Sequence, residues 1–380
     1  MPALQVAFVA PSLRILGGQA VQADRLLRAW RGDPDVNAWL VPINPTPPGP
    51  LRYLTSMRYA RTVATELTYV PSLVRELRHA DVVHVFAASY TSFLLAPLPA
   101  LIVARSLGKP VVFNYRSGEA PDHLRRSAVA RRALASAGLN IVPSRFLVDV
   151  FARFGIRAGI IPNIVDLERF AFRARPTVAP RVLSTRNFEP LYNVACTLRA
   201  FRLVQDRRPD AALTLVGSGS EERALRALAT TLALRQVTFV GRVNPDEIGR
   251  HYALNDIYVQ TPNLDNMPAS ILEAAASGLP VVATRAGGVP AIVTSGENGL
   301  LAPLDDHRAI AGHILRLLEE PDLARRLAAA AYAGCAARTW PAVRDLWLTA
   351  YRSAAARSPA GSVISRLAHH DPPTSAAAHP

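Results

Sequence analysis

Short apolar runs alternate with longer segments of helical period along most of the chain, and this alternation constrains the fold more than any other feature. In the first half the runs are residues 5–10, 36–41, 81–86, 110–114 and 139–142. The order restarts after residue 177 with runs at 181–184, 211–216, 237–240, 256–260 and 280–283. Continuous apolar strands separated by helices are typical of parallel sheets covered on both faces. The 380 residues therefore predict two α/β domains.

Polar stretches indicate where these domains end. Residues 172–180 are rich in arginine and contain proline, and boundaries fall where few apolar contacts cross. We therefore expect domains at residues 1–174 and 175–335. A further helical segment covers 336–357, and the small, polar residues 358–380 are expected to be disordered. We interpret the tail histidines as solvated side chains rather than metal ligands: His369, His370 and His379.

Composition excludes several classes of protein. The net charge is +14, and Lys109 is the only lysine. This charge indicates an anionic partner, whether nucleotide phosphates, an acidic membrane face or nucleic acid. Two cysteines cannot form a disulfide framework or a cysteine-rich zinc site, which argues for a reducing compartment. The N-terminus reads as a strand rather than a signal peptide, and prolines interrupt the longest apolar stretch, 90–107, which we interpret as a buried helix.

Two glycine-containing turns follow predicted strands. Gly17 and Gly18 precede a helix expected to begin near Gln19, an arrangement that can direct backbone N–H groups at a phosphate or simply form a tight turn. The loop 216–221 lacks the third glycine of a dinucleotide fingerprint, and no acidic residue ends the next strand. An NAD site is therefore not expected. A turn that approaches part of a nucleotide remains open.

The segment 262–283 is the most informative. Pro268 suits the first position of a helix that Asp265 or Asn266 can cap and that ends at Gly278. Asp265 then lies in the loop before the helix and can reach a different part of a ligand from Glu273. The alternative is that Asp265 only complements the helix dipole and that Glu273 pairs with an arginine.

This segment resembles the acid-x7-Glu signature of retaining glycosyltransferases of the GT4 family, which have the GT-B fold. Four other stretches agree with the family in order and spacing. They are the PS-x-F-like 142–147, the PNGVD-like 161–170, the pair 216–221 with 237–242, and 287–290 with 296–302. The resemblance implies two Rossmann-like domains facing across a cleft, with the acceptor in the first and the nucleotide sugar in the second. It also implies that helix 336–357 packs back on the first domain.

The resemblance further implies roles for individual residues. Glu273 would hold the ribose hydroxyls of the donor, Asp265 the transferred sugar, and Arg186 the leaving β-phosphate. Fixed cations and N–H dipoles must stabilise the charge that develops on a departing nucleoside diphosphate, so neither a metal nor another cofactor is expected. The predicted donor-binding residues are Gly17, Gly18, Arg116, Gly217, Gly219, Asn266, Met267, Pro268, Ser270 and Ile271, with the backbone N–H groups around the last two facing the diphosphate.

Three features depart from the family. The lysine that usually follows the arginine is absent from 188–194, and Arg116 is our candidate substitute. The loop 114–119 lacks the histidine that the family commonly has there, and Asp265 stands where glutamate is usual. Glutamate to aspartate shortens the reach by one methylene, so the sugar or its pose is expected to differ.

The first 170 residues carry most of the charge, with 20 basic against 11 acidic residues. Arginines and tyrosines gather at 52–61 and 123–132, which suits an anionic membrane face or a phosphorylated acceptor, or a merely solvated surface. Predicted acceptor-side residues are Tyr115, Ser117, Arg125 and Arg126. We interpret His84 as a core histidine.

The predicted function is retaining transfer of a hexose from a UDP- or GDP-sugar to a lipid-linked or polysaccharide acceptor. We expect a cytoplasmic protein, peripheral on the inner face of the membrane. Alternatives are a non-transferring GT-B enzyme such as a UDP-sugar 2-epimerase, and a catalytically silent protein that binds nucleotide sugar or membrane. Nucleic acid is not an expected partner, because the basic segments lack a recognised reading module.

Overall fold

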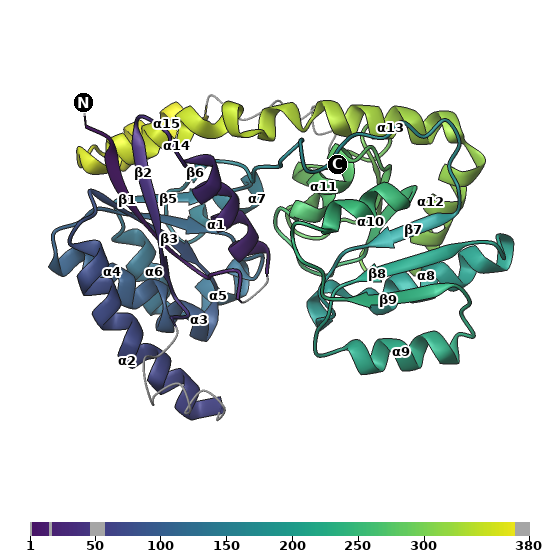
Figure 1. The fold of residues 1–380 in the computed structure, drawn as a ribbon, viewed down its shortest axis with the longest axis horizontal. Coiled ribbons are helices and arrows are strands. Elements are labelled where there is room, and N and C mark those ends of the chain that lie inside the picture. The colour runs from purple at the N-terminus through teal and green to yellow at the C-terminus, as the bar shows by residue number, and fades with distance from the viewer. Residues whose placement is uncertain (1, 15–16, 46–57, 369–380) are drawn as a thin grey trace. The chain divides into compact units, whose positions relative to one another are not determined.

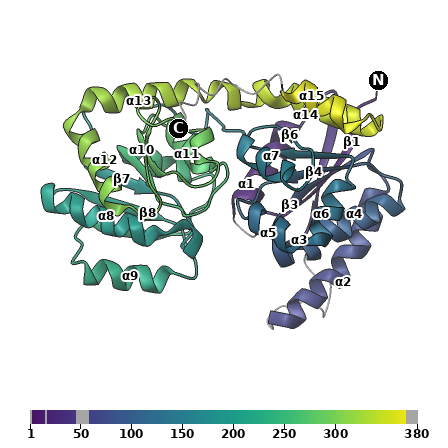
Figure 2. The same ribbon diagram turned by 180° about the vertical axis from the view of Figure 1, so that it is seen from behind.

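The computed structural model describes residues 2–14, 17–45 and 58–368 and contains two compact α/β units (Figure 1). Among these residues, the first unit comprises those up to Ile164 together with those from Val343 onward, and the second comprises Val165–Ala342. Each unit holds a six-stranded sheet with helices on both faces, which Figure 2 shows from the opposite side. The predicted fold class of two α/β domains is confirmed.

The sheet of the first unit has the strand order β2-β1-β3-β4-β5-β6, and every pairing is parallel. The five predicted runs form five of its strands, and the two-residue β6 was not predicted. The strands are β1 (Leu4–Ala10), β2 (Val36–Pro42), β3 (Val82–Ala87), β4 (Val111–Tyr115), β5 (Leu139–Val142) and β6 (Gly159–Ile160). Its helices are α1 (Gly18–Ala29), α2 (Arg58–Leu77), α3 (Tyr90–Leu95), α4 (Pro97–Ser106), α5 (Ala120–Arg126), α6 (Ala128–Ala135), α7 (Arg145–Ala152), α14 (Trp340–Ala355) and α15 (Ala360–Ala368).

The apolar stretch 90–107 forms two helices rather than the single buried helix that we predicted. Chain direction changes at Ala96, and Pro97 opens α4, where its missing N–H costs no helical hydrogen bond. Leu94 and Ile102 are exposed. No helix of the described residues is long and apolar enough to cross a membrane.

The sheet of the second unit has the order β12-β11-β10-β7-β8-β9 and is also parallel. The predicted runs form five strands, and β12 was not predicted. The strands are β7 (Arg181–Ser184), β8 (Ala212–Val216), β9 (Val237–Gly241), β10 (Ile257–Gln260), β11 (Val281–Thr284) and β12 (Leu300–Ala302). The helices are α8 (Val194–Arg207), α9 (Glu222–Thr231), α10 (Ile248–Leu254), α11 (Ala269–Ala276), α12 (His307–Glu319) and α13 (Pro321–Ala333).

Burial on both faces explains the continuous apolar runs of the inner strands of this sheet. Successive strand residues point to opposite faces, and the side chains of Val182 and Leu183 accordingly lie in two different hydrophobic clusters. Val259 and Tyr258 of β10 divide in the same way. A strand buried on both faces has no position at which a charged side chain is tolerated without a partner, so the alternation of apolar and polar residues disappears.

The boundary between the units lies at Ile164 rather than at Ala174, where we predicted it. The arginine-rich stretch is part of the second unit because its side chains are anchored there. The Phe170 ring packs edge-on against Tyr252, with 5.6 Å between ring centroids. Arg175 is buried and donates to backbone carbonyls of the second unit, among them that of Tyr252. The arginine-rich stretch resembles a linker in composition, but its side chains make tertiary contacts within the second unit.

The predicted disorder of 358–380 is wrong for Ala360–Ala368, which form α15. Val363 and Leu367 are buried, and they lie four residues apart on one face of this helix. The Leu367 side chain fills the space beside Gly159 of β6, where an added Cβ would lie 2.8 Å from it. The remaining tail, including its three histidines, lies outside the described residues.

His84 is a core histidine, as predicted. It is fully buried on β3, and burial together with the charge of Arg116 lowers the pKa of its imidazole well below the usual value. Its Nε2 lies 3.0 Å from the Asn114 amide nitrogen and its Nδ1 lies 2.7 Å from the Tyr351 hydroxyl. The amide can only donate, so Nε2 accepts and the proton sits on Nδ1. This neutral ring joins β3, β4 and α14.

Candidate active site

Arg186 follows β7 and is held from three sides. Its guanidinium donates to the Asp265 carboxylate at 2.6 Å and to the Ser270 hydroxyl at 3.3 Å. Its central carbon also lies 3.9 Å from the centre of the Tyr192 ring. Burial by itself would lower the pKa of Arg186, but Asp265 and the nearby tyrosines outweigh it and raise that pKa. The result is a fixed cation at the beginning of α11.

Helix α11 begins at Ala269, one residue later than predicted. Pro268 is its N-cap, with an extended ψ of 119°, and no side chain among the described residues caps the helix. Asp265 lies in the loop before the helix, as predicted, but its carboxylate accepts from the N–H of Asn266 at 2.8 Å instead of capping. A loop that turns back on itself in this way leaves the first turn of α11 without a side-chain cap.

One of the two amides predicted to face a diphosphate is already used. The backbone N–H of Ile271 donates to the Pro268 carbonyl at 3.2 Å. The side chains of Ile271 and Met267 pack in a hydrophobic cluster, and Asn266 is buried. In this structure the Ile271 N–H is therefore already used within the protein, and it does not face a diphosphate as predicted. That the backbone N–H of Ser270 faces the diphosphate stays a prediction.

Glu273 lies one turn further along α11 and is buried. Its carboxylate accepts from the hydroxyl of Tyr252, a fully buried residue of α10, at 2.9 Å. The same hydroxyl lies 2.7 Å from the Thr185 hydroxyl, next to Arg186 in sequence. Tyr252 is a site residue that the sequence reasoning missed, because nothing in the spacing of residues 252 and 273 signals that they meet.

Gln260 connects Arg186 to the end of β10. Its Oε1 accepts from the Ser270 hydroxyl at 3.0 Å and from the Tyr258 hydroxyl at 3.3 Å. Ser270 thus accepts from Arg186 and donates to Gln260. Gln260 and Tyr258 are both fully buried and were not predicted. The carboxyl end of a parallel strand is where ligands bind in open α/β sheets, so their position is a signal that could have found them.

Gly217 and Gly219 let two loops lie backbone against backbone. An added Cβ at Gly217 would lie 2.1 Å from the Arg186 carbonyl oxygen, and one at Gly219 would lie 2.3 Å from the Phe188 carbonyl oxygen. The N–H of Phe188 also donates to Ser218 at 3.0 Å. The structure therefore gives these glycines a packing role in placing the Arg186 loop, and a contact with the donor stays a prediction.

Three of the predicted donor-binding residues, Gly17, Gly18 and Arg116, belong to the first unit. Helix α1 begins at Gly18, close to the predicted start, and added Cβ atoms at Gly17 and Gly18 would meet nothing within 4 Å among the described residues. Arg116 donates to the Asn114 side chain at 3.1 Å, and burial lowers its pKa to about 9. Their donor contacts remain predictions.

The predicted acceptor-side residues differ in their exposure to solvent. Tyr115 is fully buried, with its hydroxyl 2.8 Å from His123 Nδ1, so it presents no surface to an acceptor in this structure. Arg125 and Arg126 are exposed and both pair with Asp122. The basic run 52–61 lies outside the residues whose side chains are described. Within the part of the chain that the structure describes, no group of three or more metal-ligating side chains occurs.

Solved proteins share this architecture at low sequence identity. A sucrose-phosphate synthase from Thermosynechococcus elongatus superposes with a TM-score of 0.75, at 21% identity, over 93% of this chain and 100% of the other. HepE of Anabaena, solved with UDP-glucose, gives a TM-score of 0.69 at 19% identity, over 96% and 98% of the two chains. Together with the two parallel six-stranded sheets, this likeness shows the GT-B fold.

Sequence comparison identifies the family. The Glycosyltransferase Family 4 model matches residues 16–169, and the Glycosyl transferases group 1 model matches residues 168–334. This chain belongs to the GT4 glycosyltransferases.

Curated relatives match only in part. The sulfoquinovosyl transferase of Arabidopsis thaliana is 27% identical over 63% of this chain and 50% of its own length. A GDP-mannose-dependent phosphatidylinositol monomannoside mannosyltransferase of Mycolicibacterium smegmatis is 31% identical over 58% of this chain and 63% of its own length. The chain thus spans about half to two thirds of the length of these two relatives.

Proposed function

We propose that this protein is a retaining glycosyltransferase that moves a hexose from a UDP- or GDP-linked sugar to a lipid-linked or saccharide acceptor. The observation that carries the proposal is the convergence of Arg186 with the first turn of α11 and with Asp265. A fixed guanidinium and a helix N-terminus together suit a pyrophosphate. The mannosyltransferase relative is by name GDP-mannose-dependent, which supports a nucleotide sugar as donor.

Charge development explains what Arg186 would do. When the sugar leaves, negative charge grows on the terminal phosphate of the nucleoside diphosphate, and a preorganised cation stabilises that charge without reorganisation. Arg186 is preorganised by Tyr192 and Ser270. Asp265 pairs with this guanidinium, and a bound diphosphate would share it with Asp265. An arginine in this role makes a metal ion unnecessary, so transfer should persist in the presence of EDTA.

Glu273 would bind the ribose in the family's manner. Tyr252 donates to one of its carboxylate oxygens, and a carboxylate can accept further hydrogen bonds from ribose hydroxyls. Retention of configuration follows if the acceptor attacks from the side on which the diphosphate departs, a route that needs no protein nucleophile.

The acceptor side is proposed from charge and exposed apolar surface. Leu67, Val70 and Val74 form an exposed stripe along α2, and the first 170 residues carry nine net positive charges. Apolar side chains beside arginines suit an anionic membrane face, where a lipid-linked acceptor would be met at the inner surface. Co-sedimentation with phosphatidylglycerol vesicles should be lost at high salt and should weaken in Leu67→Asp. If the protein pelleted equally well with neutral vesicles, the proposed binding to an anionic membrane face would be contradicted.

Donor hydrolysis and transfer across a panel of UDP-, GDP- and ADP-sugars test the proposal. We expect turnover with one of the first two. Glu273→Gln should weaken nucleotide binding by about tenfold to a hundredfold, because a charge-assisted hydrogen bond contributes about 1.5–3 kcal/mol. Glu319→Gln, at the end of α12 and outside the site, is the control and should bind normally. Epimerised donor, or silence throughout the panel with Glu273→Gln indistinguishable from the parent, would overturn the transferase assignment.

A further inference from the structure

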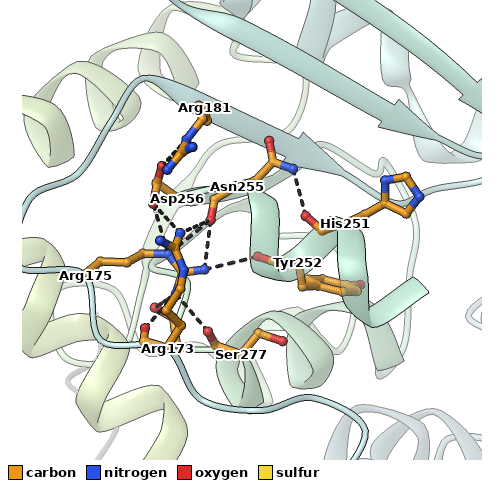
Figure 3. A network of polar contacts seen from close by, with 9 residues as sticks. Arg173, Arg175, Arg181, His251, Tyr252, Asn255, Asp256 and Ser277 are labelled. Atoms are coloured by element: carbon orange, nitrogen blue, oxygen red, sulfur yellow. Dashed lines mark hydrogen bonds and ion pairs between the residues drawn. The ribbon is translucent and has the colours of Figure 1, made fainter. Parts of the chain in front are cut away.

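Arg175 is the most heavily bonded buried cation in the second unit's described contacts, and the proposed chemistry does not use it (Figure 3). Its side chain is 3% exposed. Its three nitrogens donate to five backbone carbonyls, which belong to Tyr252, Asn255, Ser277, Gly278 and Arg173. It also pairs with Asp256 at 3.3 Å.

Four of these carbonyls are the C-terminal ends of two helices. Tyr252 and Asn255 lie in the last turn and at the C-cap of α10, and Ser277 and Gly278 lie at the C-cap of α11 and one residue beyond. The last carbonyls of a helix have no partner within it, and the helix dipole makes them attract a cation. Arg175 satisfies both ends with one planar group, which holds α10 and α11 side by side at this end.

The two helices meet again at the proposed donor site. Tyr252 of α10 donates from its hydroxyl to Glu273 of α11 at 2.9 Å, while its own carbonyl accepts from Arg175 at 3.1 Å. Glu273 is also connected to the C-terminal end of α11, because its backbone carbonyl accepts a hydrogen bond from the N–H of Ser277 at 3.0 Å. A single residue, Tyr252, thus connects the guanidinium of Arg175 to the carboxylate of Glu273.

Neighbouring arginines provide an internal comparison. Asp256 is buried and also pairs with Arg173 and Arg181, each at 2.6 Å. The Arg181 side chain is about half exposed and its described contact is with Asp256 alone. Burial lowers the pKa of Arg175 to about 10, with Asp256 opposing the shift, so the group keeps its charge at neutral pH.

We propose that Arg175 is a positioning residue for donor binding: by bridging the C-terminal ends of α10 and α11 it sets the place of Tyr252, and through Tyr252 that of the Glu273 carboxylate. The inference deepens the proposed function and rests on it for the identity of the ligand. It concerns the placement of helices, so Arg175 itself touches no substrate.

Lysine is the informative replacement. Arg175→Lys keeps the charge beside Asp256, but an ammonium has three donors on one atom and cannot span carbonyls of two helices. Tyr252→Phe keeps the ring and removes the hydroxyl that reaches Glu273. Arg181→Gln is the matched control, because it removes a partner of the same Asp256 without touching either helix end.

The full-length protein is used for two measurements, with thermal melting to show that each variant folds. Calorimetric titration gives the Kd for UDP and for GDP, and hydrogen exchange reports the amides of α10 and α11. We expect Arg175→Lys and Tyr252→Phe each to weaken nucleotide binding about tenfold, as outer-shell changes do. The double variant should bind the nucleotide no more weakly than whichever single variant has the lower affinity. Exchange in α10 and α11 should rise in Arg175→Lys but not in Arg181→Gln.

The outcomes separate this inference from the proposed function. Multiplying effects in the double variant, or Arg175→Lys matching Arg181→Gln in both Kd and exchange, would overturn the positioning role. If the parent protein binds neither nucleotide, the proposed function fails, and hydrogen exchange alone then decides whether Arg175 holds the two helices. If Arg175→Lys does not fold, unchanged nucleotide affinity in a folded Tyr252→Phe overturns the route through Tyr252.

Discussion

At the scale of single residues, the candidate site depends on how one cation is held. Arg186 contacts Tyr192, Asp265 and Ser270, which come from two segments of the second unit: the turn before α8, and the loop and first turn of α11. Each contact restricts a different degree of freedom: the ring fixes the plane of the guanidinium, and the two oxygens fix its rotation. Preorganisation of this kind is what stabilises developing charge, so small changes in the side chain should have large kinetic effects.

We expect Arg186→Lys to lower kcat of sugar transfer by about a hundredfold or more, because losing one preorganised donor typically costs 10²–10³ in rate. Lysine can neither stack as a plane on Tyr192 nor donate to two oxygens as a fork. Arg226→Lys is the control, since Arg226 likewise stacks on a ring, that of Phe239, and pairs with Glu222. A steady-state assay in which both variants lose activity equally would contradict the assignment.

At the scale of elements, loops and helices place those residues. The loop after β8 lies against the loop after β7, and the closeness of their backbones depends on Gly217 and Gly219. In the described part of the chain no side chain caps the first turn of α11, and Arg186 and Gln260 contact this turn through the Ser270 hydroxyl. Glycine at these two positions therefore allows the two loops to pack closely, whether or not a ligand also contacts them.

Gly217→Ala should destabilise the protein by about 2 kcal/mol or more, because an unavoidable overlap with backbone forces the two loops apart. The added Cβ would lie 2.1 Å from the Arg186 carbonyl oxygen. Gly312→Ala is the control, because Gly312 lies within α12 and an added Cβ there would meet nothing within 4 Å among the described residues. That change should stabilise by about 0.5–1 kcal/mol through helix propensity. Urea unfolding of both variants measures the difference, and equal midpoints would refute the close approach.

A second prediction at this scale concerns the packing of helix α15. Leu367 is 1% exposed and packs beside β6, so Leu367→Ala should lower the free energy of unfolding by about 2–4 kcal/mol, the usual cost of removing a buried leucine side chain. The neighbouring Arg366→Ala should change it by less than about 0.5 kcal/mol. A Leu367→Ala variant as stable as Arg366→Ala would show that α15 does not pack as described.

At the scale of the whole chain, the C-terminal residues complete the first unit. Arg344 of α14 donates to Asp33 at 2.7 and 2.9 Å and to Asp35 at 2.6 Å, across about 310 residues of sequence. The Tyr351 hydroxyl reaches His84 in the core of the same unit. The first unit is therefore discontinuous in sequence, and its stability depends on both ends of the chain.

Acid should weaken this connection in a defined range. The hydrogen bond from Arg344 lowers the pKa of Asp33 below its ordinary 3.8, with burial opposing. A carboxylate with a lowered pKa stabilises the folded state above its unfolded pKa, and this contribution is lost as pH falls through the lowered value. Melting temperatures of the parent and of Asp33→Asn should therefore differ near neutral pH, and the difference should shrink as the pH falls below 3.8. A difference that stays constant as the pH is lowered from 7 to well below 3.8 would contradict the pairing.

Sequence reasoning determined those features that arise from local pattern. Buried parallel strands need continuous apolar residues, so ten of the twelve strands of the described residues were predicted, and only the short β6 and β12 were missed. Asp265 was placed in a loop and Glu273 on a helix for the same reason, and the family motifs indicated Arg186.

Tertiary structure alone decided which side chains meet. Tyr252 and Glu273 are 21 residues apart and Arg186 and Asp265 are 79 apart; sheet order and helix packing, which have no local signature, bring them together. The same holds for Arg175, whose surroundings look like a linker in sequence and are a buried helix junction in the fold, and for the boundary at Ile164. Periodicity is a property of neighbouring residues, whereas a site is a property of segments that only folding makes neighbours.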